Sequence, residues 1–237
     1  MLNNIYEMLR ENTYPGRGIL IGQSADSSRA IIAYFIMGRS ENSRNRVFEA
    51  TDDGFRTKAH DPAKLTDPSL VIYNPVRRVG TSTIITNGDQ TDTIRDFFVS
   101  GGRFRDALMT REFEPDGPNF TPRISGVVYK GGIYSLSILK SADGNPDCCC
   151  RYFFDYSSPI PGTGHFISTY QGDGNPLPSF AGEPVAVTID CGYRELADKL
   201  WSAMDADNKV SLYTCEIDIQ SGAFEYVIIN KHEEACI

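Results

Sequence analysis

The sequence predicts an α+β protein in which two packed β-sheets are covered by helices. Three observations lead to this fold class: four segments have the pattern of β-hairpins, the few helical segments fall between and among them, and many predicted strands are apolar at nearly every position. Strands that are apolar throughout need cover on both faces. Helices grouped between runs of hairpins are typical of α+β layering.

The four predicted hairpins supply at least eight strands. Each hairpin consists of two apolar runs joined by a polar or glycine-containing turn, which is the usual signature of antiparallel strands. The paired runs are residues 19–23 with 30–38, 69–79 with 81–86, 124–129 with 133–139, and 210–219 with 223–230.

Three helices are predicted from apolar residues at helical spacing. Two of them, at 91–100 and 104–113, follow each other around a pair of glycines, and the third runs over 193–204. The stretches richest in glycine and proline lie inside the series of strands, so no linker divides the chain. We therefore expect one domain with insertions.

The composition is that of an ordinary globular protein. The chain has 237 residues, of which 41% are hydrophobic and 23% charged. Its longest uncharged apolar run, residues 30–38, is far shorter than the roughly 20 residues that cross a bilayer. The N-terminus lacks the basic start and apolar stretch of a signal peptide. These features predict a cytoplasmic protein that has no membrane partner.

The net charge and the spacing of the cysteines and histidines argue against further classes of protein. Lysine and arginine number 23 against 31 aspartate and glutamate, and this net charge of −8 argues against nucleic acid as a partner. Three of the six cysteines are adjacent at 148–150, there is no C-x-x-C, and the three histidines are far apart. We expect free thiols and no metal site. The common hydrolase, nucleoside triphosphate and dinucleotide motifs are missing, which weakens those classes without excluding them.

Polar residues gather beside several predicted strands. The segment 39–46 places three arginines on a loop, where their planar guanidinium groups suit a phosphate or a carboxylate. The alternative is a solvated hairpin end with surface ion pairs. Tyr73 and Asn74 come just before Pro75, which interrupts strand pairing. A single tyrosine in such a place is also compatible with a core or rim position.

Two further polar segments border the predicted helices. Residues 86–93 form a strand-to-helix junction, where backbone N–H groups bind anions, although Asp89 and Asp92 would repel an anion unless they cap the helix. Residues 112–117 carry three acidic side chains that would supply a general acid or base if one carboxyl were buried. A solvated helix end is the alternative for this segment.

Taken in order, these motifs resemble the archaeal-type IMP cyclohydrolase family. The ordered set is R-S…N-R, Y-N-P-x-R, N-G-x-x-T-D-T-I, E-x-D and T-P-R-I, and it runs from about Tyr14-Pro15-Gly16-Arg17-Gly18 through Ile124, continuing more faintly over 167–170. The third and fifth motifs at this distance form a fairly specific pair. Relative to the family pattern, the chain has an N-terminal extension at about 1–13 and an insertion at about 143–164. We expect residues 1–237 to form a single domain.

The resemblance implies a fold and a reaction. The fold is a four-layer αββα sandwich of the N-terminal-nucleophile hydrolase type, here without such a nucleophile because Met1 is followed by Leu2. The reaction is the last step of purine synthesis, in which the carboxamide nitrogen of 5-formamidoimidazole-4-carboxamide ribotide attacks the formyl carbon and water leaves to give IMP. The partner is this small purine nucleotide, no metal or other cofactor takes part, and homo-oligomerisation is left open.

The resemblance also implies the site residues. The active-site arginine, tyrosine and glutamate of the family fall on Arg46, Tyr73 and Glu114. Arg46 is expected to bind substrate and stabilise charge, and the other two to transfer protons in an order left open. This chain has two extra residues before Arg46, so Arg44 is an alternative for that position. The substrate-binding candidates are Asn74, Arg77, Asn87, Gly88, Asp92, Thr121 and Arg123.

Two other functions remain open at this point. One is a non-catalytic protein that binds or senses purine nucleotides on the same fold, although the retained arginine, tyrosine and glutamate argue against a decayed site. The other is a related enzyme that forms or hydrolyses amides, which the lack of a nucleophile disfavours.

Overall fold

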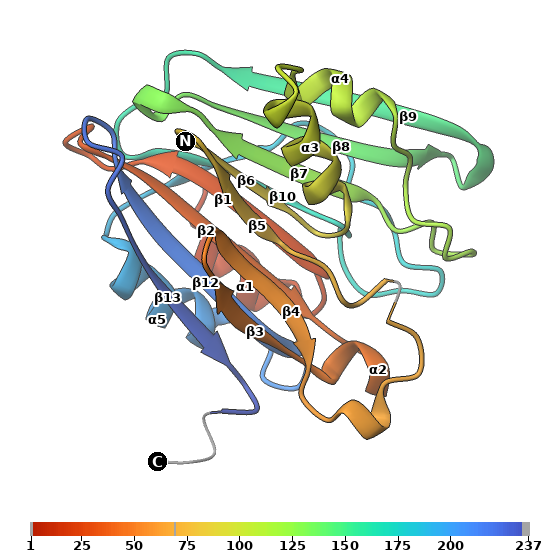
Figure 1. The fold of residues 1–237 in the computed structure, drawn as a ribbon. Helices are drawn as coiled ribbons and strands as arrows, with labels where there is room; N and C mark the ends of the chain where they lie inside the picture. The colour runs from red at the N-terminus through yellow and green to blue at the C-terminus, as the bar shows by residue number, and fades with distance from the viewer. Residues whose placement is uncertain (1, 69, 234–237) are drawn as a thin grey trace.

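Two antiparallel β-sheets pack face to face in the computed structural model, which describes residues 2–68 and 70–233 (Figure 1). The first sheet has the strand order β11-β10-β1-β2-β12-β13. Its strands are β1 (Arg17–Gln23), β2 (Arg29–Met37), β10 (Thr163–Ser168), β11 (Val185–Thr188), β12 (Lys209–Asp218) and β13 (Phe224–Asn230).

The second sheet is a meander in which each strand pairs with its neighbour in sequence, in the order β3 to β9. Its strands are β3 (Arg46–Thr51), β4 (Gly54–Ala59), β5 (Val76–Val79), β6 (Ser82–Thr86), β7 (Arg123–Val128), β8 (Tyr134–Ala142) and β9 (Asn145–Tyr156). The structure thus confirms the predicted α+β class with two packed sheets.

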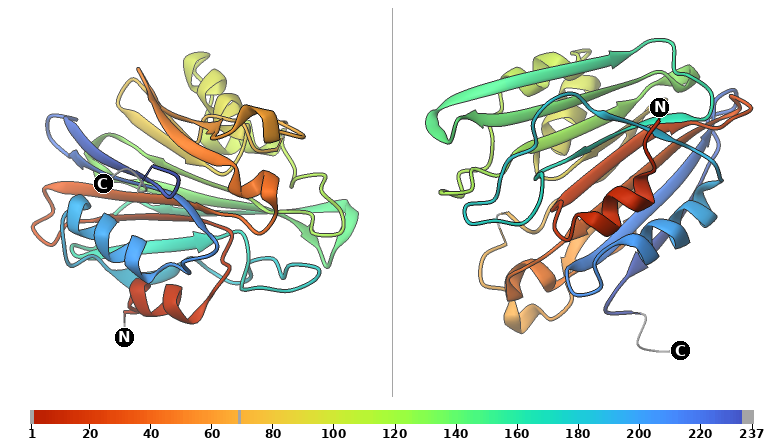
Figure 2. Two further views of the ribbon diagram at one scale, coloured as in Figure 1. Left: turned by 90° about the horizontal axis from the view of Figure 1, so that it is seen from below. Right: turned by 180° about the vertical axis from the view of Figure 1, so that it is seen from behind.

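Helices cover the outer face of each sheet, as the two turned views show (Figure 2). The helices α1 (Ile5–Glu11) and α5 (Tyr193–Ala203) share one apolar core with the first sheet. The helices α3 (Gln90–Val99) and α4 (Phe104–Met109) share another with the second sheet. A third core lies between the sheets. The order of layers is therefore helix, sheet, sheet, helix.

All four predicted hairpins are present, as β1–β2, β5–β6, β7–β8 and β12–β13. Some predicted boundaries were wrong. The strand expected over 69–79 begins only at Val76, because the Asn74-Pro75 peptide interrupts pairing, and position 69 lies outside the described residues. The helix expected over 104–113 ends at Met109. Three further elements were not predicted from the sequence: α1, α2 (Glu41–Arg44) and the β3–β4 hairpin.

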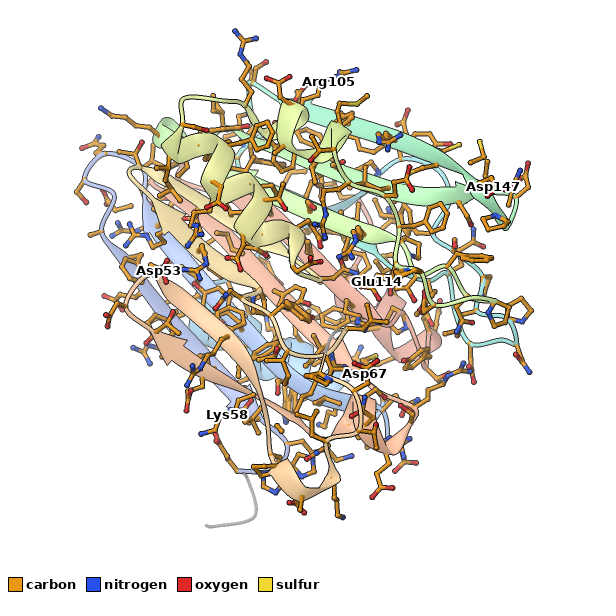
Figure 3. The ribbon with its side chains drawn as sticks, turned by 45° about the vertical axis from the view of Figure 1, so that its right-hand side comes forward. Asp53, Lys58, Asp67, Arg105, Glu114 and Asp147 are labelled. Carbon is orange, nitrogen blue, oxygen red and sulfur yellow. The ribbon has the colours of Figure 1, made fainter. Side chains whose placement is uncertain are left out.

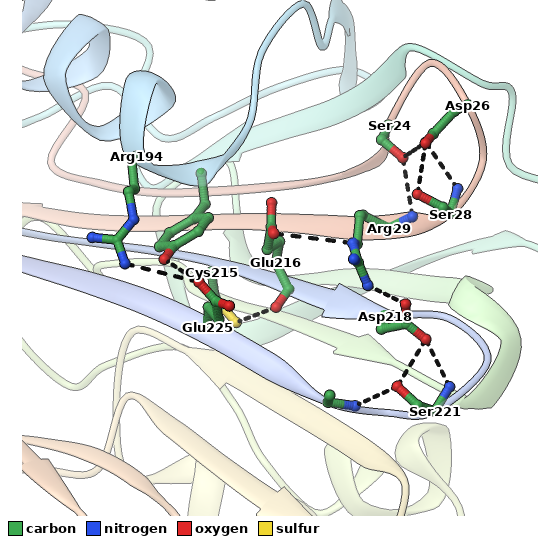
Figure 4. A network of polar contacts seen from close by, with 12 residues as sticks. Ser24, Asp26, Ser28, Arg29, Arg194, Cys215, Glu216, Asp218, Ser221 and Glu225 are labelled. Carbon is green, nitrogen blue, oxygen red and sulfur yellow. Dashed lines mark hydrogen bonds and ion pairs between the residues drawn. The ribbon is translucent and has the colours of Figure 1, made fainter.

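Polar side chains organise the turns at one end of the first sheet (Figure 4). Asp26 accepts hydrogen bonds from the Ser24 hydroxyl and the Ser28 backbone in the β1–β2 turn, and Asp218 does the same for Ser221 after β12. Arg29, at the start of β2, forms an ion pair with Asp218. The two hairpin ends are thereby joined, at the end of β1 opposite Arg17.

Candidate active site

The arginine-rich segment does not form a single loop, which corrects the prediction for residues 39–46. Ser40 and Ser43 form a reciprocal capping box that starts the short helix α2, and β3 begins two residues after it. The three arginines therefore point to different places. Arg39 pairs with Asp173 at the surface. Arg44 is exposed and bonds to the Gly38 carbonyl and the Asn208 side chain.

Arg46 alone of these arginines is fully buried, with 0% of its surface exposed. It opens β3 and faces the core between the sheets, as Phe48 does two residues later. Its Nε donates to the Ser43 carbonyl at 2.7 Å and its Nη2 to the Met37 carbonyl at 3.3 Å. Its Nη1 has no hydrogen-bond partner among the described residues. Burial, and then the charge of Arg17, lower the pKa of Arg46.

Tyr73 lies between the sheets just before β5. Its backbone N–H donates to Thr57 Oγ1 on β4 at 2.8 Å, and its carbonyl accepts from the Thr57 N–H at 2.8 Å. Its hydroxyl oxygen lies 2.8 Å from that of Tyr34, on β2 of the other sheet. Burial, and then the proximity of Tyr73, raise the pKa of Tyr34 well above its usual range. Tyr34 is therefore a neutral hydrogen-bonding partner at physiological pH.

Glu114 does not lie at a solvated helix end, because only 2% of its surface is exposed. The chain between α4 and β7 folds back so that the Glu114 N–H donates to the Thr121 carbonyl at 2.9 Å. Figure 3 shows the side chain toward the middle of the molecule, far from surface residues such as Lys58 and Asp147. Burial raises the pKa of Glu114 to about 7, against the opposing effects of Arg17, Arg123 and Arg46.

Arg17 belongs to the same buried cluster, although it was not among the candidates selected from the sequence. It alternates with Ile19 and Ile21 along β1, which places it on the face between the sheets. Burial alone lowers its pKa, but Glu114 and then Tyr170, Tyr73 and Tyr14 hold the pKa well above its usual range. The Tyr14-Pro15-Gly16-Arg17-Gly18 motif was the signal in the sequence that could have identified Arg17.

A hydrogen-bonded chain borders Glu114. Asp116 accepts from the Thr121 backbone N–H at 2.6 Å and from the Thr121 hydroxyl at 2.5 Å. The Thr121 oxygen lies 2.6 Å from the Tyr170 hydroxyl, which therefore donates to it. Burial, against an opposing effect of Arg17, raises the pKa of Tyr170 to about 12. Thr121 thus joins two groups that the sequence analysis did not select.

The loop before α3 packs against the other side of Glu114. A Cβ at Gly88 would lie 2.5 Å from Arg123 Nη1 and 3.5 Å from Glu114 Oε1, so a larger residue does not fit without displacing Arg123. Asn87 has a structural role. Its side-chain NH2 donates to the Pro122 carbonyl, and its side-chain oxygen accepts from the Ile124 N–H. Arg123 donates to Gln90 at 2.8 Å.

Asp89 occupies the cap position of α3 but makes no side-chain capping bond, so the capping interpretation was wrong for it. Its carboxylate instead pairs with Arg123 at 2.7 Å and with Arg111 at 2.5 Å. Positive charge, rather than helix N–H groups, holds this carboxylate in place. Burial raises the pKa of Asp89, but the charges of Arg123 and Arg111 outweigh this effect and lower it.

Three other candidates form a second network. Arg77 Nε donates to Asp92 at 2.6 Å and its Nη1 to Asp53 at 2.5 Å. The Asn74 amide also donates to Asp92, at 3.3 Å. The structure therefore brings Asn74, Arg77 and Asp92 together with one another, on the half-exposed side of β5 next to α3.

The central cluster combines the groups that acid–base chemistry requires. Two guanidinium groups and the Tyr73 hydroxyl lie between the two sheets, and the buried Glu114 carboxyl, whose pKa is near neutrality, interacts with both guanidinium groups. Such groups exchange protons and stabilise developing negative charge in a site that excludes water. The fold and the site therefore define a two-sheet α+β protein with a buried cluster of ionisable side chains, the candidate active site.

Comparison with known proteins identifies the group within that class. The sequence model of the IMP cyclohydrolase-like protein family matches residues 14–221. The chain belongs to this family, which confirms the resemblance noted in the sequence.

Curated archaeal relatives agree with this assignment. The chain is 36% identical over 128 residues to an IMP cyclohydrolase of Methanococcus maripaludis strain C7, covering 51% of this chain and 61% of the relative. It is 30% identical over 161 residues to the IMP cyclohydrolase of Methanopyrus kandleri, covering 66% of this chain and 75% of the relative. The aligned part thus spans about three fifths of the first relative and three quarters of the second.

Two general properties of the described residues complete the description of the site. Within 2–68 and 70–233, no three histidine, cysteine, aspartate or glutamate side chains gather as they would around a metal ion. In the same part of the chain, no helix has the length and apolar character needed to span a bilayer.

Proposed function

We propose that this protein is an IMP cyclohydrolase, which closes the ring of 5-formamidoimidazole-4-carboxamide ribotide with loss of water to give IMP. The observation that carries the proposal is the buried Glu114 carboxyl, whose pKa is raised to about 7 in the same cluster as Arg46, in a chain of this family. A carboxyl with such a pKa both gives and takes protons near neutral pH.

The reaction assigns one role to each of three groups. As the carboxamide nitrogen forms a bond to the formyl carbon, it loses one proton and the electron pair of the formyl C=O bond moves onto oxygen. Water then leaves as that oxygen is protonated and the formamido nitrogen loses its proton to form the C=N bond. We assign Arg46 to substrate binding and charge stabilisation, and Tyr73 and Glu114 to the two proton transfers.

The remaining candidates divide by their position. Thr121, Gly88 and Arg123 border Glu114, so we propose that they shape the pocket for the reacting end of the nucleotide. Asn87 supports them through its bonds to the β7 backbone. Asn74, Arg77 and Asp92 are proposed to contact the nucleotide farther from the reaction centre. Arg77 would have to exchange a carboxylate partner for phosphate, because it already pairs with two.

The arrangement of layers supports the expected fold type. Two antiparallel sheets with helices on both outer faces fit a sandwich of the N-terminal-nucleophile hydrolase type. In the proposed reaction, internal residues supply the chemistry in place of a terminal nucleophile. We propose that residues 1–237 act as one domain for this activity, with about 1–13 and 143–164 as additions.

The test is direct. Purified protein is mixed with the formamido ribotide, and the absorbance of IMP is followed with and without EDTA. Turnover in both conditions is expected, because the guanidinium groups already supply the positive charge. Turnover that EDTA abolishes and a divalent ion restores would overturn the cofactor-free scheme. A protein that binds IMP but forms none would instead be a non-catalytic nucleotide-binding protein.

A further inference from the structure

Two buried guanidinium nitrogens at the site lack hydrogen-bond partners. Within the described residues, Arg17 Nε and Arg46 Nη1 are two of only three buried side-chain nitrogen or oxygen atoms without a partner. A buried donor left unpaired destabilises a protein, and the cost is greater when the donor is charged. Such groups therefore call for an explanation, and a catalytic role is one of the usual ones.

The two guanidinium groups belong to one site. They enter the space between the sheets from opposite sides, Arg17 from β1 of the first sheet and Arg46 from β3 of the second. Tyr73 and Tyr14 act on both guanidinium groups and raise the pKa of each. Arg17 also lowers the pKa of Arg46, as expected for like charges in close proximity. Two adjacent buried cations favour an anion between them.

The position of Glu114 decides which anion this is. Glu114 is the charged group with the largest effect on Arg17, so a phosphate dianion placed at Arg17 would be repelled by the proton-transfer carboxylate. The formyl oxygen differs, because it gains negative charge only during the reaction and is then protonated by a neighbouring acid. Donors that act at that moment stabilise the transition state more than the substrate.

We propose that Arg17 Nε and Arg46 Nη1 form an oxyanion hole that holds the formyl oxygen as the carboxamide nitrogen attacks. This inference rests on the proposed function and adds Arg17 to its catalytic residues. The balance of the step is unchanged: the C–N bond forms, the C=O electron pair moves onto the oxygen between the two guanidinium groups, and the oxygen leaves as water. Arg17 neither gains nor loses a proton.

Arg17 also acts on the titration of Glu114. The charged and titratable groups that act on Glu114 are Arg17, Arg123, Asp116 and Arg46, and Arg17 has the largest effect of these. Loss of the Arg17 charge raises the pKa of Glu114 further. The limb of the pH–rate profile that reports Glu114 should therefore move to higher pH.

The experiment compares kcat and KM from pH 5 to 9 for wild type, Arg17→Gln and Arg17→Lys. The Glu114→Gln variant shows which limb of the pH–rate profile belongs to Glu114, because that limb is lost in the variant. Arg29→Gln is the matched control, because Arg29 opens β2 at the opposite end of the same pair of strands. Thermal unfolding shows that each variant is folded.

The expected result is a loss of about 10²–10³-fold in kcat for Arg17→Gln, with KM little changed and the Glu114 limb moved to higher pH. Arg17→Lys keeps the positive charge, so its Glu114 limb should lie at the same pH as in wild type. Its kcat should lie between the values of Arg17→Gln and wild type. Arg29→Gln should behave as wild type.

Four outcomes would overturn the inference. A folded Arg17→Gln with normal kcat and an unmoved limb would remove Arg17 from the reaction while leaving the proposed function intact. A raised KM at unchanged kcat would place the phosphate at Arg17 instead. If Arg17→Gln fails to fold, Arg17→Lys provides the test instead. A wild-type kcat for Arg17→Lys would show that a hydrogen bond from Arg17 Nε to the formyl oxygen is not needed. An inactive wild type would end the proposed function and this inference together.

Discussion

The hydroxyl oxygens of Tyr34 and Tyr73 lie 2.8 Å apart, and their hydrogen bond joins the two sheets across the core. Tyr34 is 0% exposed and its pKa is raised well above its usual range, first by burial, so it keeps its proton. It can therefore donate to Tyr73 if Tyr73 gives up its own proton. The bond also fixes the direction of the Tyr73 hydroxyl.

Removal of the Tyr73 hydroxyl should affect the chemical step rather than binding. Tyr73→Phe keeps the ring, so we expect IMP to bind with nearly normal affinity while kcat falls by about 10²–10⁴-fold. Tyr34→Phe removes only the supporting hydrogen bond and should lower kcat by about tenfold. Steady-state kinetics and IMP titration of both variants measure these effects. A near-normal kcat for Tyr73→Phe would show that its role is misassigned.

Glu114 should make folding stability fall as pH rises. Its pKa of about 7 in the folded protein exceeds the ordinary value of ~4.3 in the unfolded chain. Between these values the folded state holds more protons, so the stabilising contribution is complete below about pH 4 and is lost by about pH 7. The difference is on the order of 3 kcal/mol.

Denaturant unfolding of wild type and Glu114→Gln from pH 4 to 8 measures this contribution. The amide does not titrate, so the variant should gain stability relative to wild type as the pH rises through this range. The same stability difference at pH 4 and pH 8 would contradict a raised pKa at Glu114. In the kinetic assay, Glu114→Gln should lower kcat with KM little changed.

The two nearby arginines should differ sharply in their effect on catalysis. Arg46 is buried in the cluster, whereas Arg44 is exposed and bonds to the Gly38 carbonyl and Asn208. A charge-assisted contact is worth about 1.5–3 kcal/mol, so Arg46→Ala should lower kcat/KM by about ten- to hundredfold. Arg44→Ala should leave it within about twofold. The reverse result would assign the catalytic position to Arg44.

A single methyl group at Gly88 should disturb the site without removing a polar atom. In Gly88→Ala, the new Cβ would meet Arg123 Nη1 and Gln90 Oε1 at 2.5 and 2.6 Å, so the ends of these two side chains must shift. We expect kcat/KM to fall by about tenfold or more. Gly172→Ala is the matched control, because its Cβ would meet only Asn12 Oδ1 at 3.7 Å. Equal activity of the two variants would exclude tight packing at Gly88.

Local patterns in the sequence determined the hairpins and the class of the fold. The apolar runs around short turns predicted β1–β2 and β12–β13 because strand pairing across a tight turn depends on neighbours in sequence. The short α2 was missed because all four of its residues are polar, and the β3–β4 hairpin was missed because charged residues interrupt its short apolar strands. Their structure depends on a capping box and on packing against the other sheet.

The sequence motifs by themselves selected Arg46, Tyr73 and Glu114, but only the tertiary structure decided what surrounds them. The burial of Glu114 and the closeness of Arg17 arise from segments that are distant along the chain and are brought together by the tertiary fold. Electrostatic effects depend on distance and on exclusion of water, neither of which a linear pattern records. The motif around Arg17 drew attention to that segment, but only the packed sheets show that its guanidinium group lies close to Glu114 and Arg46.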